Sequence, residues 1–265
     1  MFKSSYPQRI VCLTEEPTET LCLLGAKDKI VGISGFTVRP KDIRKEKPVI
    51  CTFTEAKVDE IKALKPDLVV GFSDLQATIA SQLIKEGIQV LIFNQRSVNE
   101  ILTMMRMLGN VIGETEKAAI LVEQLEERIN SLAEKSAQKK EKPVVYFEEW
   151  YDPLISGIGW VSELIEIAGG KECFPEFPSK KLAKERIIAD PTEVIRRQPD
   201  ILIASWCGKM FKPEKVKARP GWEEIPAVRN RHLYEIKSSI ILQPGPAALT
   251  DGLDRLVEII EGFSD

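Results

Sequence analysis

Apolar and polar positions alternate with two different periods along most of the chain. Short apolar runs rich in β-branched residues, such as RIVCL (9–13) and KIVGI (29–33), are typical of buried strands. Two segments each predict an amphipathic helix, a Pro or Gly stop and an apolar strand in succession. They are VDEIKALKPDLVVGF (58–72) and IASQLIKEGIQVLIF (79–93). Strands that alternate with helices of about ten residues predict parallel β–α units.

The pattern changes at Val98, where two helical segments follow each other without a strand. The second, TEKAAILVEQLEERINSLAEKSAQ, would span roughly 36 Å as a helix. After Pro143 the β–α alternation resumes, and EVIRRQPDILIAS repeats the helix, Pro-Asp turn and strand of EIKALKPDLVVGF. The sequence therefore predicts two similar α/β lobes, 1–97 and 142–265, with linker helices over 98–141.

Three local expectations follow from turn and capping signals. The first helix is expected to have Thr18 as its N-cap and to end at Gly25. The stretch YFEEWYDPLISGIGW (146–160) is expected to be irregular, because Asp152-Pro153 and two glycines interrupt it. Trp222, in a segment rich in turn residues, is expected to pack at the surface.

Composition excludes some classes of function. A hydrophobic fraction of 43% and a charged fraction of 29% describe an ordinary globular protein. The net charge is -3 and basic residues are interspersed with acidic ones, so we expect no nucleic-acid partner. No run of 18 or more apolar residues occurs, so we expect no membrane insertion.

The cysteines and the N-terminus bear on the compartment. Five cysteines without a C-x-x-C motif predict free buried thiols in a reducing compartment. No apolar signal segment precedes the first strand, so the sequence as it stands predicts a cytoplasmic protein. If a signal was removed, the expectation becomes a periplasmic or an anchored extracellular protein.

Aromatic side chains gather where the predicted strands end. In open parallel sheets, ligands bind beyond the carboxyl ends of the strands. Trp150, Trp160 and Trp206 all follow predicted strands of the second lobe. Any one of them could simply fill the core of a loop. Three together, accompanied by amide side chains, favour a small-molecule site.

Catalytic chemistry has little support. The only histidine, His232, lies at a strand start without carboxylates at ligand spacing, so we expect no metal site. Cys207 has no base nearby in the pattern. GISG and SGIG do not match a dinucleotide fingerprint. The sequence therefore predicts that the protein is not an enzyme.

The order of several segments resembles the helical-backbone periplasmic-binding-protein family of ABC importers. The resemblance rests on IVCLTEEPTETLCLLGAKDKIVGIS, VDEIKALKPDLVV, the long central helix, EEWYDP…GWVSELIEIAGG and RPGWEEIPAVRNRHLYEI. It is similar in particular to the cobalamin-binding branch. The resemblance implies an α/β fold of two Rossmann-like lobes with parallel sheets, joined by a single long α-helix, with the ligand between them.

The resemblance also implies which residues contact the ligand. Carried over position by position, the predicted ligand-binding residues are Glu15, Glu16, Phe36, Phe53, Phe72, Gln95, Trp150, Tyr151, Trp160, Trp206 and Gln243. Aromatic rings would bury the apolar faces of a corrin, and amides would pair with its amide rim. Two segments depart from the branch: SGFTVRP stands after the second strand and EEPTE opens the first helix.

The expected function is binding of cobalamin without chemistry, by a monomer with no intrinsic cofactor. An ABC-transporter permease is the implied protein partner, which family members contact through one acidic residue on each lobe. Glu223 or Glu224 would serve on the second lobe, and the first lobe has no clear equivalent near 76–78. The alternatives are a ferric siderophore or haem as ligand, a corrinoid- or tetrapyrrole-processing enzyme, and an intracellular adaptor.

Overall fold

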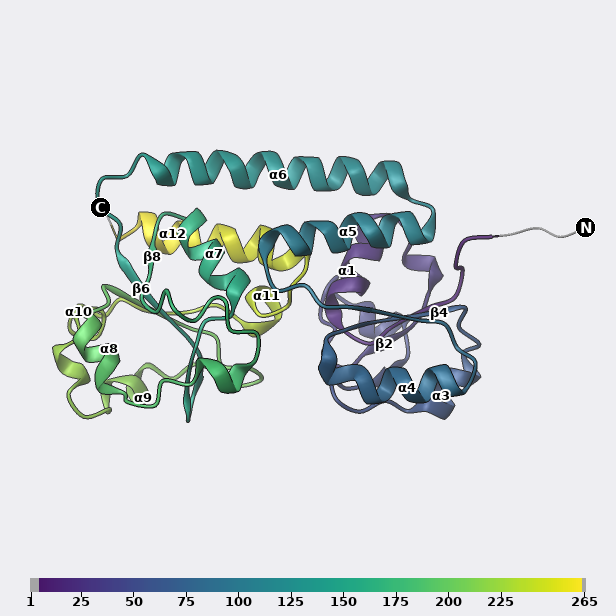
Figure 1. Cartoon of the computed structure of the whole chain (residues 1–265), viewed down its shortest axis with the longest axis horizontal. Coiled ribbons are helices and arrows are strands. Elements are labelled where there is room, and N and C mark those ends of the chain that lie inside the picture. Colours follow the sequence, from purple (N-terminus) through teal and green to yellow (C-terminus); the bar gives the residue numbers. More distant parts are fainter. Residues whose placement is uncertain (1–4, 264–265) are drawn as a thin grey trace, which may run out of the picture. The chain divides into compact units, whose positions relative to one another are not determined.

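The computed structural model describes residues 5–263, which form two compact units. Unit 1 ends at Gln95 and also takes in Asn99–Gln124. Unit 2 contains Arg96–Val98 and the described chain from Leu125 onward. Each unit has its own five-stranded sheet with helices packed on it (Figure 1).

The sheet of unit 1 is parallel throughout, in the order β3-β2-β1-β4-β5. Its central strands are buried on both faces, which explains why they read as continuous apolar runs. The strands are β1 (Ile10–Cys12), β2 (Ile30–Ser34), β3 (Val49–Cys51), β4 (Leu68–Phe72) and β5 (Val90–Phe93).

Helices cover both faces of this sheet, as the β–α alternation predicts. In Figure 1, α3 and α4 lie on one face, while α1 and α5 lie on the other. The α-helices are α1 (Glu15–Leu23), α2 (Ile43–Glu46), α3 (Val58–Ala63), α4 (Ala77–Lys85) and α5 (Val98–Ile112). Two 3-10 turns, η1 (Lys27–Lys29) and η2 (Asp74–Gln76), complete the described elements of the unit.

Unit 2 has a mixed sheet in the order β10-β9-β6-β7. The strands β10, β9 and β6 are parallel, whereas β7 runs antiparallel to β6. The short β8 pairs with the first two residues of β6, so β7 and β8 share one edge of that strand. The strands are β6 (Val144–Tyr151), β7 (Leu154–Ser156), β8 (Lys171–Glu172), β9 (Ile201–Ala204) and β10 (Leu233–Glu235).

The helices of unit 2 are mostly short. In Figure 1, α7 and α12 lie on one side of the sheet and α8, α9 and α10 on the other. The α-helices are α7 (Gly159–Ile167), α8 (Thr192–Arg197), α9 (Pro213–Lys217), α10 (Pro226–Arg229), α11 (Ser238–Ile241) and α12 (Leu253–Glu261). The shorter turns are η3 (Ala183–Arg186), η4 (Trp222–Glu224) and the π-helical η5 (Ala248–Gly252).

One helix, α6 (Thr115–Ala137), begins in unit 1 and ends in unit 2. Its 23 residues match the length expected from the sequence. Ala118 and Val122 are buried before the boundary at Gln124, and Leu125 and Ile129 are buried after it. Two sheets of mainly parallel strands with helices confirm the predicted α/β class. Within residues 5–263, no helix combines the length and apolar character needed to cross a membrane.

Three local predictions were wrong. Helix α1 begins at Glu15 with Thr14 as N-cap, because Glu15, Glu16 and Pro17 all suit a first helical turn. The stretch 146–160 is not irregular, since β6 and β7 form a hairpin in which Tyr151 pairs with Leu154. Pro153 falls in the turn, where it removes no hydrogen bond from the ladder.

The third wrong prediction concerns Trp222, whose side chain is only 1% exposed. Its ring packs edge-on against Tyr146, 6.1 Å between centroids, inside the core of unit 2. Glycine and proline neighbours suggested a surface turn, yet a turn can carry one large side chain into the core. The short helix η4 does so here.

Candidate functional site

In unit 1, the predicted residues Glu15 and Glu16 lie in the first turn of α1, directly after β1. Their side chains are 5% and 2% exposed. The hydroxyl of Thr14 donates to Oε1 of Glu16 over 2.8 Å. The free N–H groups of a helix N-terminus favour carboxylates nearby, which helps to hold these two side chains at a buried position.

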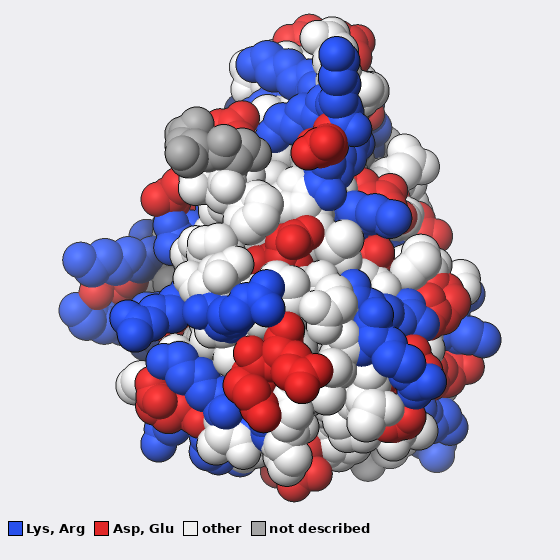
Figure 2. All heavy atoms as spheres, turned by 90° about the vertical axis from the view of Figure 1, so that its left-hand side faces the viewer, with Lys and Arg blue, Asp and Glu red and all other residues white. Residues whose placement is uncertain are grey.

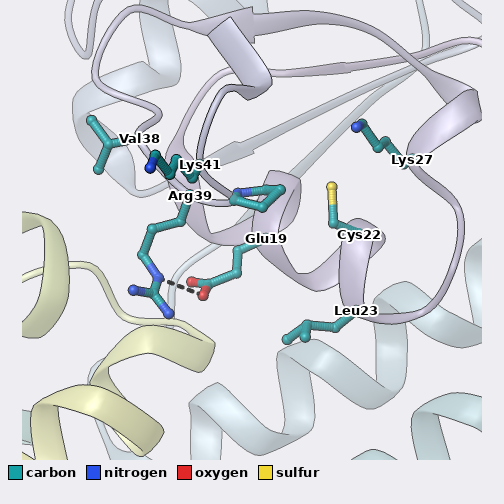
Figure 3. Close-up of a pocket in the computed structure, with 8 residues that line it drawn as sticks. Glu19, Cys22, Leu23, Lys27, Val38, Arg39 and Lys41 are labelled. Atoms are coloured by element: carbon teal, nitrogen blue, oxygen red, sulfur yellow. Dashed lines mark hydrogen bonds and ion pairs between the residues drawn. The ribbon is translucent and has the colours of Figure 1, made fainter. Parts of the chain in front are cut away.

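Burial has a large effect on Glu15. Burial, and after it repulsion from Glu16 and from Glu19, raise the pKa of this carboxyl from 4.5 to about 8. Arg39 opposes the shift and is itself paired with Glu19, its Nε lying 2.7 Å from Oε1 (Figure 3). Near neutral pH, Glu15 is therefore largely protonated and can donate as well as accept a hydrogen bond.

A pocket of about 560 Å³ lies beside α1 in the same unit. Figure 3 shows Arg39 reaching across it toward Glu19, with Cys22 and Leu23 further along the helix. Its lining residues are Glu19, Cys22, Leu23, Lys27, Val38, Arg39, Pro40 and Lys41. None of the predicted ligand-binding residues is among them. Three of its charged side chains are already paired, Glu19 with Arg39 and Lys27 with Glu46, so these three offer little to an ionic ligand.

The predicted aromatic residues of unit 1 are only partly brought together. The rings of Phe53 and Phe72 lie 6.5 Å apart, whereas Phe36 is 53% exposed after β2. Gln95 follows β5, is 3% exposed and lines a small pocket of about 200 Å³.

Sequence reasoning missed Gln76, which connects three strand exits of unit 1. Its side-chain oxygen accepts from the N–H of Phe72 over 2.9 Å, and its Nε2 donates to the carbonyls of Phe53 (3.0 Å) and Leu13 (3.3 Å). Gly71 leaves room for it, since a Cβ there would lie 2.5 Å from the Gln76 oxygen. A fully buried amide with three backbone partners holds loops in place.

Unit 2 assembles a continuous aromatic group at the end of β6. Tyr151 packs between Trp150 and Trp206, at centroid distances of 5.0 and 4.5 Å, and Trp206 packs edge-on against Phe211 at 5.2 Å. Trp206 is 3% exposed, while Trp150 and Tyr151 are half-buried. The indole N–H of Trp150 donates to the Asp152 carbonyl over 2.7 Å. Three predicted residues therefore form one surface, with Trp150 and Tyr151 partly open to solvent.

A buried charge network supports this aromatic group. Glu148 has no exposed side-chain surface, and its carboxylate accepts two hydrogen bonds from Arg219, at 2.6 and 2.9 Å. It also accepts from Nε1 of Trp206 (2.9 Å) and from the Tyr146 hydroxyl (3.1 Å). Burial, and next the Glu148 charge, raise the pKa of Tyr146 well above its ordinary value. The network fixes the indole on which Tyr151 packs.

Glu149, the next residue along β6, lies where the register of β6 against β7 shifts, and it has a partner of its own. Its Oε2 lies 2.6 Å from Nη1 of Arg186, which is 1% exposed. The two glutamates thus have separate arginine partners and do not form an acid–base pair.

Two lysines lie against the aromatic group. Nζ of Lys209 donates to the Tyr151 hydroxyl over 3.0 Å and lies 4.9 Å from the centroid of the Trp150 ring. Nζ of Lys215 lies 4.4 Å from the Tyr151 ring centroid. The hydrogen bond from Lys209 lowers the pKa of Tyr151. Sequence reasoning missed both lysines, because exposed lysines in a polar segment are usually no more than solvated.

The other two predicted residues of unit 2, Trp160 and Gln243, lie in other segments of the chain than the aromatic group. Trp160 is in the first turn of α7, 2% exposed, with its indole N–H donating to the Ile241 carbonyl over 2.9 Å. Gln243 lies between α11 and η5 and is partly exposed. A contact between either residue and a ligand stays a prediction.

The described residues also bear on reactivity. Burial raises the pKa of Cys12, Cys51 and Cys173 to about 12, so these thiols stay protonated and are poor nucleophiles. The five cysteines are free, as predicted, but the prediction that they are buried is wrong for Cys207, which is exposed, and for Cys22, which is partly exposed.

Within residues 5–263, no group of three or more His, Cys, Asp or Glu side chains is arranged to hold a metal ion. On the face drawn in Figure 2, basic and acidic side chains are intermixed.

Comparisons with known proteins agree on one family. The family described as "Periplasmic binding protein" matches residues 10–240. The "Uncharacterized ABC transporter substrate-binding lipoprotein YvrC" of Bacillus subtilis (strain 168) is 27% identical, over 96% of this chain and 80% of that protein. A "Vitamin B12-binding protein" of Vibrio parahaemolyticus is 24% identical, over 97% of this chain and 89% of that protein.

A similar fold is found among solved structures. The periplasmic heme-binding protein RhuT from Roseiflexus sp. RS-1, solved in apo form, superposes with a TM-score of 0.79 at 23% identity. The match covers 97% of this chain and all of that one. At this identity the likeness establishes the fold and no more.

Proposed function

The chain belongs to the periplasmic binding protein family, and from this premise we propose that it binds a corrinoid, cobalamin in particular, without changing it. The family places it among substrate-binding proteins of the ABC-importer type. The corrinoid is the step beyond the family. Delivery of the ligand to a permease, outside the cytoplasmic membrane, is part of the proposal.

The observation that carries the proposal is the aromatic surface of Trp150 and Tyr151. Both rings are half-buried, and Tyr151 packs against Trp206, which Glu148 holds. A corrin presents broad apolar faces, and a supported aromatic surface can cover one of them with little loss of side-chain entropy. The vitamin B12-binding relatives point the same way.

Binding without chemistry agrees with the side chains present. The buried thiols are protonated, and Glu148 and Glu149 are each committed to an arginine. A corrinoid-processing enzyme would need a base or nucleophile that faces the ligand. Recovery of unmodified cobalamin after prolonged incubation with the protein is the expected result.

Haem is a second candidate, and one observation favours it. Lys209 and Lys215 place two ammonium groups beside Tyr151, where the carboxylates of a haem or an anionic siderophore would find partners. The heme-binding protein of similar fold agrees with haem as ligand, but a shared fold does not distinguish haem from cobalamin.

The deciding experiment is calorimetric titration of the purified protein with cyanocobalamin, hemin and a ferric siderophore. We expect saturable heat and thermal stabilisation with cyanocobalamin. Saturable binding of hemin alone would replace cobalamin by the second candidate. No response to any corrinoid would refute the proposal.

Substitutions at one position sharpen the test. Trp150→Ala is expected to weaken cobalamin binding by roughly ten- to a hundredfold with the fold intact, because one of the two partly exposed rings is lost. Trp150→Phe keeps a ring and should retain most of the affinity. If Trp150→Ala instead lowers stability by about 3–5 kcal/mol and leaves affinity unchanged, the side chain fills a core and does not face the ligand.

A further inference from the structure

The two lysines beside the aromatic group suggest a more specific role. Lys209 and Lys215, with Trp150 and Tyr151, are called the lysine–aromatic cluster below. Lys209 contacts both rings, 4.9 Å from the Trp150 centroid and 5.3 Å from the Tyr151 centroid, and it also donates to the Tyr151 hydroxyl. Lys215 approaches the same tyrosine ring from α9. Two positive charges thus converge on one phenol.

Neither ammonium group has a carboxylate partner among the described residues. Two nearby acidic side chains have other partners: Glu214 pairs with Lys217 at 3.0 Å, and Oε1 of Glu235 accepts from the N–H of Phe211 at 3.0 Å. Glu148 is buried against Arg219. The cluster therefore places two ammonium groups without an ion-pair partner in residues 5–263 next to a partly open aromatic surface.

The loop that carries Lys209 is built to bring it there. Trp206 lies two residues after β9, Gly208 follows with φ of 70°, and the N–H of Lys209 donates to the Trp206 carbonyl over 3.0 Å. Glycine adopts this left-handed conformation without the cost of a Cβ. The turn reverses the chain so that the Lys209 side chain lies over the rings instead of extending away.

A flat ligand that stacks on Trp150 must compete with Lys209 for the ring. Contact between an ammonium group and an aromatic face is weak at an exposed site, whereas a charge-assisted hydrogen bond to an anion is stronger. A ligand with an acidic group at its rim would offer Lys209 a better partner, while the flat face of the ligand stacks on the Trp150 ring in place of the ammonium group. A ligand without such a group would only displace the lysine.

We propose that Lys209, Lys215 and the Tyr151 hydroxyl form an anion subsite that takes a phosphate or carboxylate at the rim of a flat ligand stacked on Trp150. The inference rests on the proposed function and deepens it. In cobalamin the acidic group is the phosphodiester that links the corrin to its nucleotide, and cobinamide lacks that phosphodiester. In haem the acidic groups are the two propionates. The subsite therefore selects complete cobalamin over cobinamide.

The test compares cyanocobalamin with dicyanocobinamide on the native protein and on the variant Lys209→Gln/Lys215→Gln, by fluorescence or calorimetric titration at low salt. The variant is expected to lose about tenfold or more in affinity for cyanocobalamin and to keep its affinity for dicyanocobinamide within about twofold. The difference should shrink in ~1 M salt, which screens charge interactions at exposed sites.

A matched control removes two other lysines of unit 2. Lys135 and Lys140 are exposed and precede β6, so they lie toward the opposite end of that strand from Tyr151. Lys135→Gln/Lys140→Gln changes the net charge equally and should leave both affinities unchanged. An equal loss of cyanocobalamin affinity in both double variants would mean that the lysines act by long-range attraction of the ligand. That result would overturn the subsite.

The remaining outcomes separate the inference from the proposed function. If Lys209→Gln/Lys215→Gln binds both corrinoids as the native protein does, the subsite is wrong and cobalamin binding stands. If the native protein binds neither corrinoid but binds hemin, the proposed function falls. In that case, weaker hemin binding by Lys209→Gln/Lys215→Gln would support the subsite, with a carboxylate as its anion. Unchanged hemin binding by this variant would refute the subsite. If nothing binds, both are refuted.

Discussion

Unit 1 and unit 2 each bury glutamate in or directly after a central strand, but they stabilise it differently. In unit 1, Glu15 and Glu16 follow β1 at the start of a helix, and Glu15 is buried with its pKa raised to about 8. In unit 2, Glu148 lies within β6 and accepts four hydrogen bonds, two of them from Arg219.

The difference shows two solutions to the cost of burying a carboxylate. Unit 2 keeps the charge and supplies a partner, which fixes the positions of all the groups involved. Unit 1 crowds three carboxyl groups together and lets one of them hold a proton. The first arrangement suits a rigid supporting wall, and the second makes the local charge of unit 1 depend on pH.

The largest expected effect comes from removing the partner in unit 2. Arg219→Ala should lower the free energy of unfolding by about 3–5 kcal/mol, because it leaves Glu148 as an uncompensated buried charge. Urea denaturation followed by circular dichroism measures it. Adding Glu148→Gln should recover part of the loss, since the buried charge is then gone. A loss below about 1 kcal/mol for Arg219→Ala would show that the comparison between the units is mistaken.

The next effect is the pH dependence of unit 1. A carboxyl whose pKa is raised on folding binds more protons in the folded state, so its contribution to stability falls as pH rises from 4.5 to about 8. Glu15→Gln should therefore stabilise the protein at pH 8 by roughly 2–4 kcal/mol relative to its effect at pH 4.5. Denaturation across this pH range measures it. Parallel curves for native protein and variant would contradict the raised pKa.

A smaller effect is expected for the ion pair of unit 1. Arg39→Ala breaks a pair with Glu19 that is partly open to solvent, so the loss should be about 1 kcal/mol or less. Because Arg39 also opposes the shift of Glu15, its removal should raise the Glu15 pKa further and extend the pH-dependent loss upward. A loss equal to that of Arg219→Ala would erase the distinction between the two ion pairs.

The smallest effect concerns titration of one tyrosine. Lys209 lowers the pKa of Tyr151 by stabilising the phenolate, so Lys209→Met should raise that pKa, with little change in stability. Ultraviolet absorbance at alkaline pH measures it, and subtraction of the same titration on Tyr151→Phe isolates the signal. An unchanged titration would mean that Lys209 spends little time on the hydroxyl.

The sequence predicted the parts of the fold that depend on local periodicity. Apolar runs that alternate with amphipathic helices gave the parallel sheets, and the uninterrupted pattern after Val98 gave α5 and α6. The hairpin of β6 and β7 was missed because Asp152-Pro153 marks a turn without saying what flanks it. The start of α1 was missed because Thr18 was preferred as cap over Thr14, which precedes two glutamates and a proline.

The candidate site was less accessible to sequence reasoning. Trp150, Tyr151 and Trp206 were found because large aromatics at strand ends are unusual. Lys209, Lys215, Arg219 and Gln76 were missed, since their partners are 4 to 71 positions away along the chain. No local pattern distinguishes a lysine that lies over a ring from a lysine in water. Only the folded chain brings the two together.

Helix α6 has a consequence for how the molecule unfolds. Its first half packs with unit 1 and its second half with unit 2, and the boundary falls between Gln124 and Leu125 in mid-helix. Unfolding of either unit would expose the apolar surface of its half of α6. It would also shorten the helix to which the other half of α6 belongs. The two units should therefore lose structure in a single cooperative transition, and neither should survive as a fragment cut at their boundary.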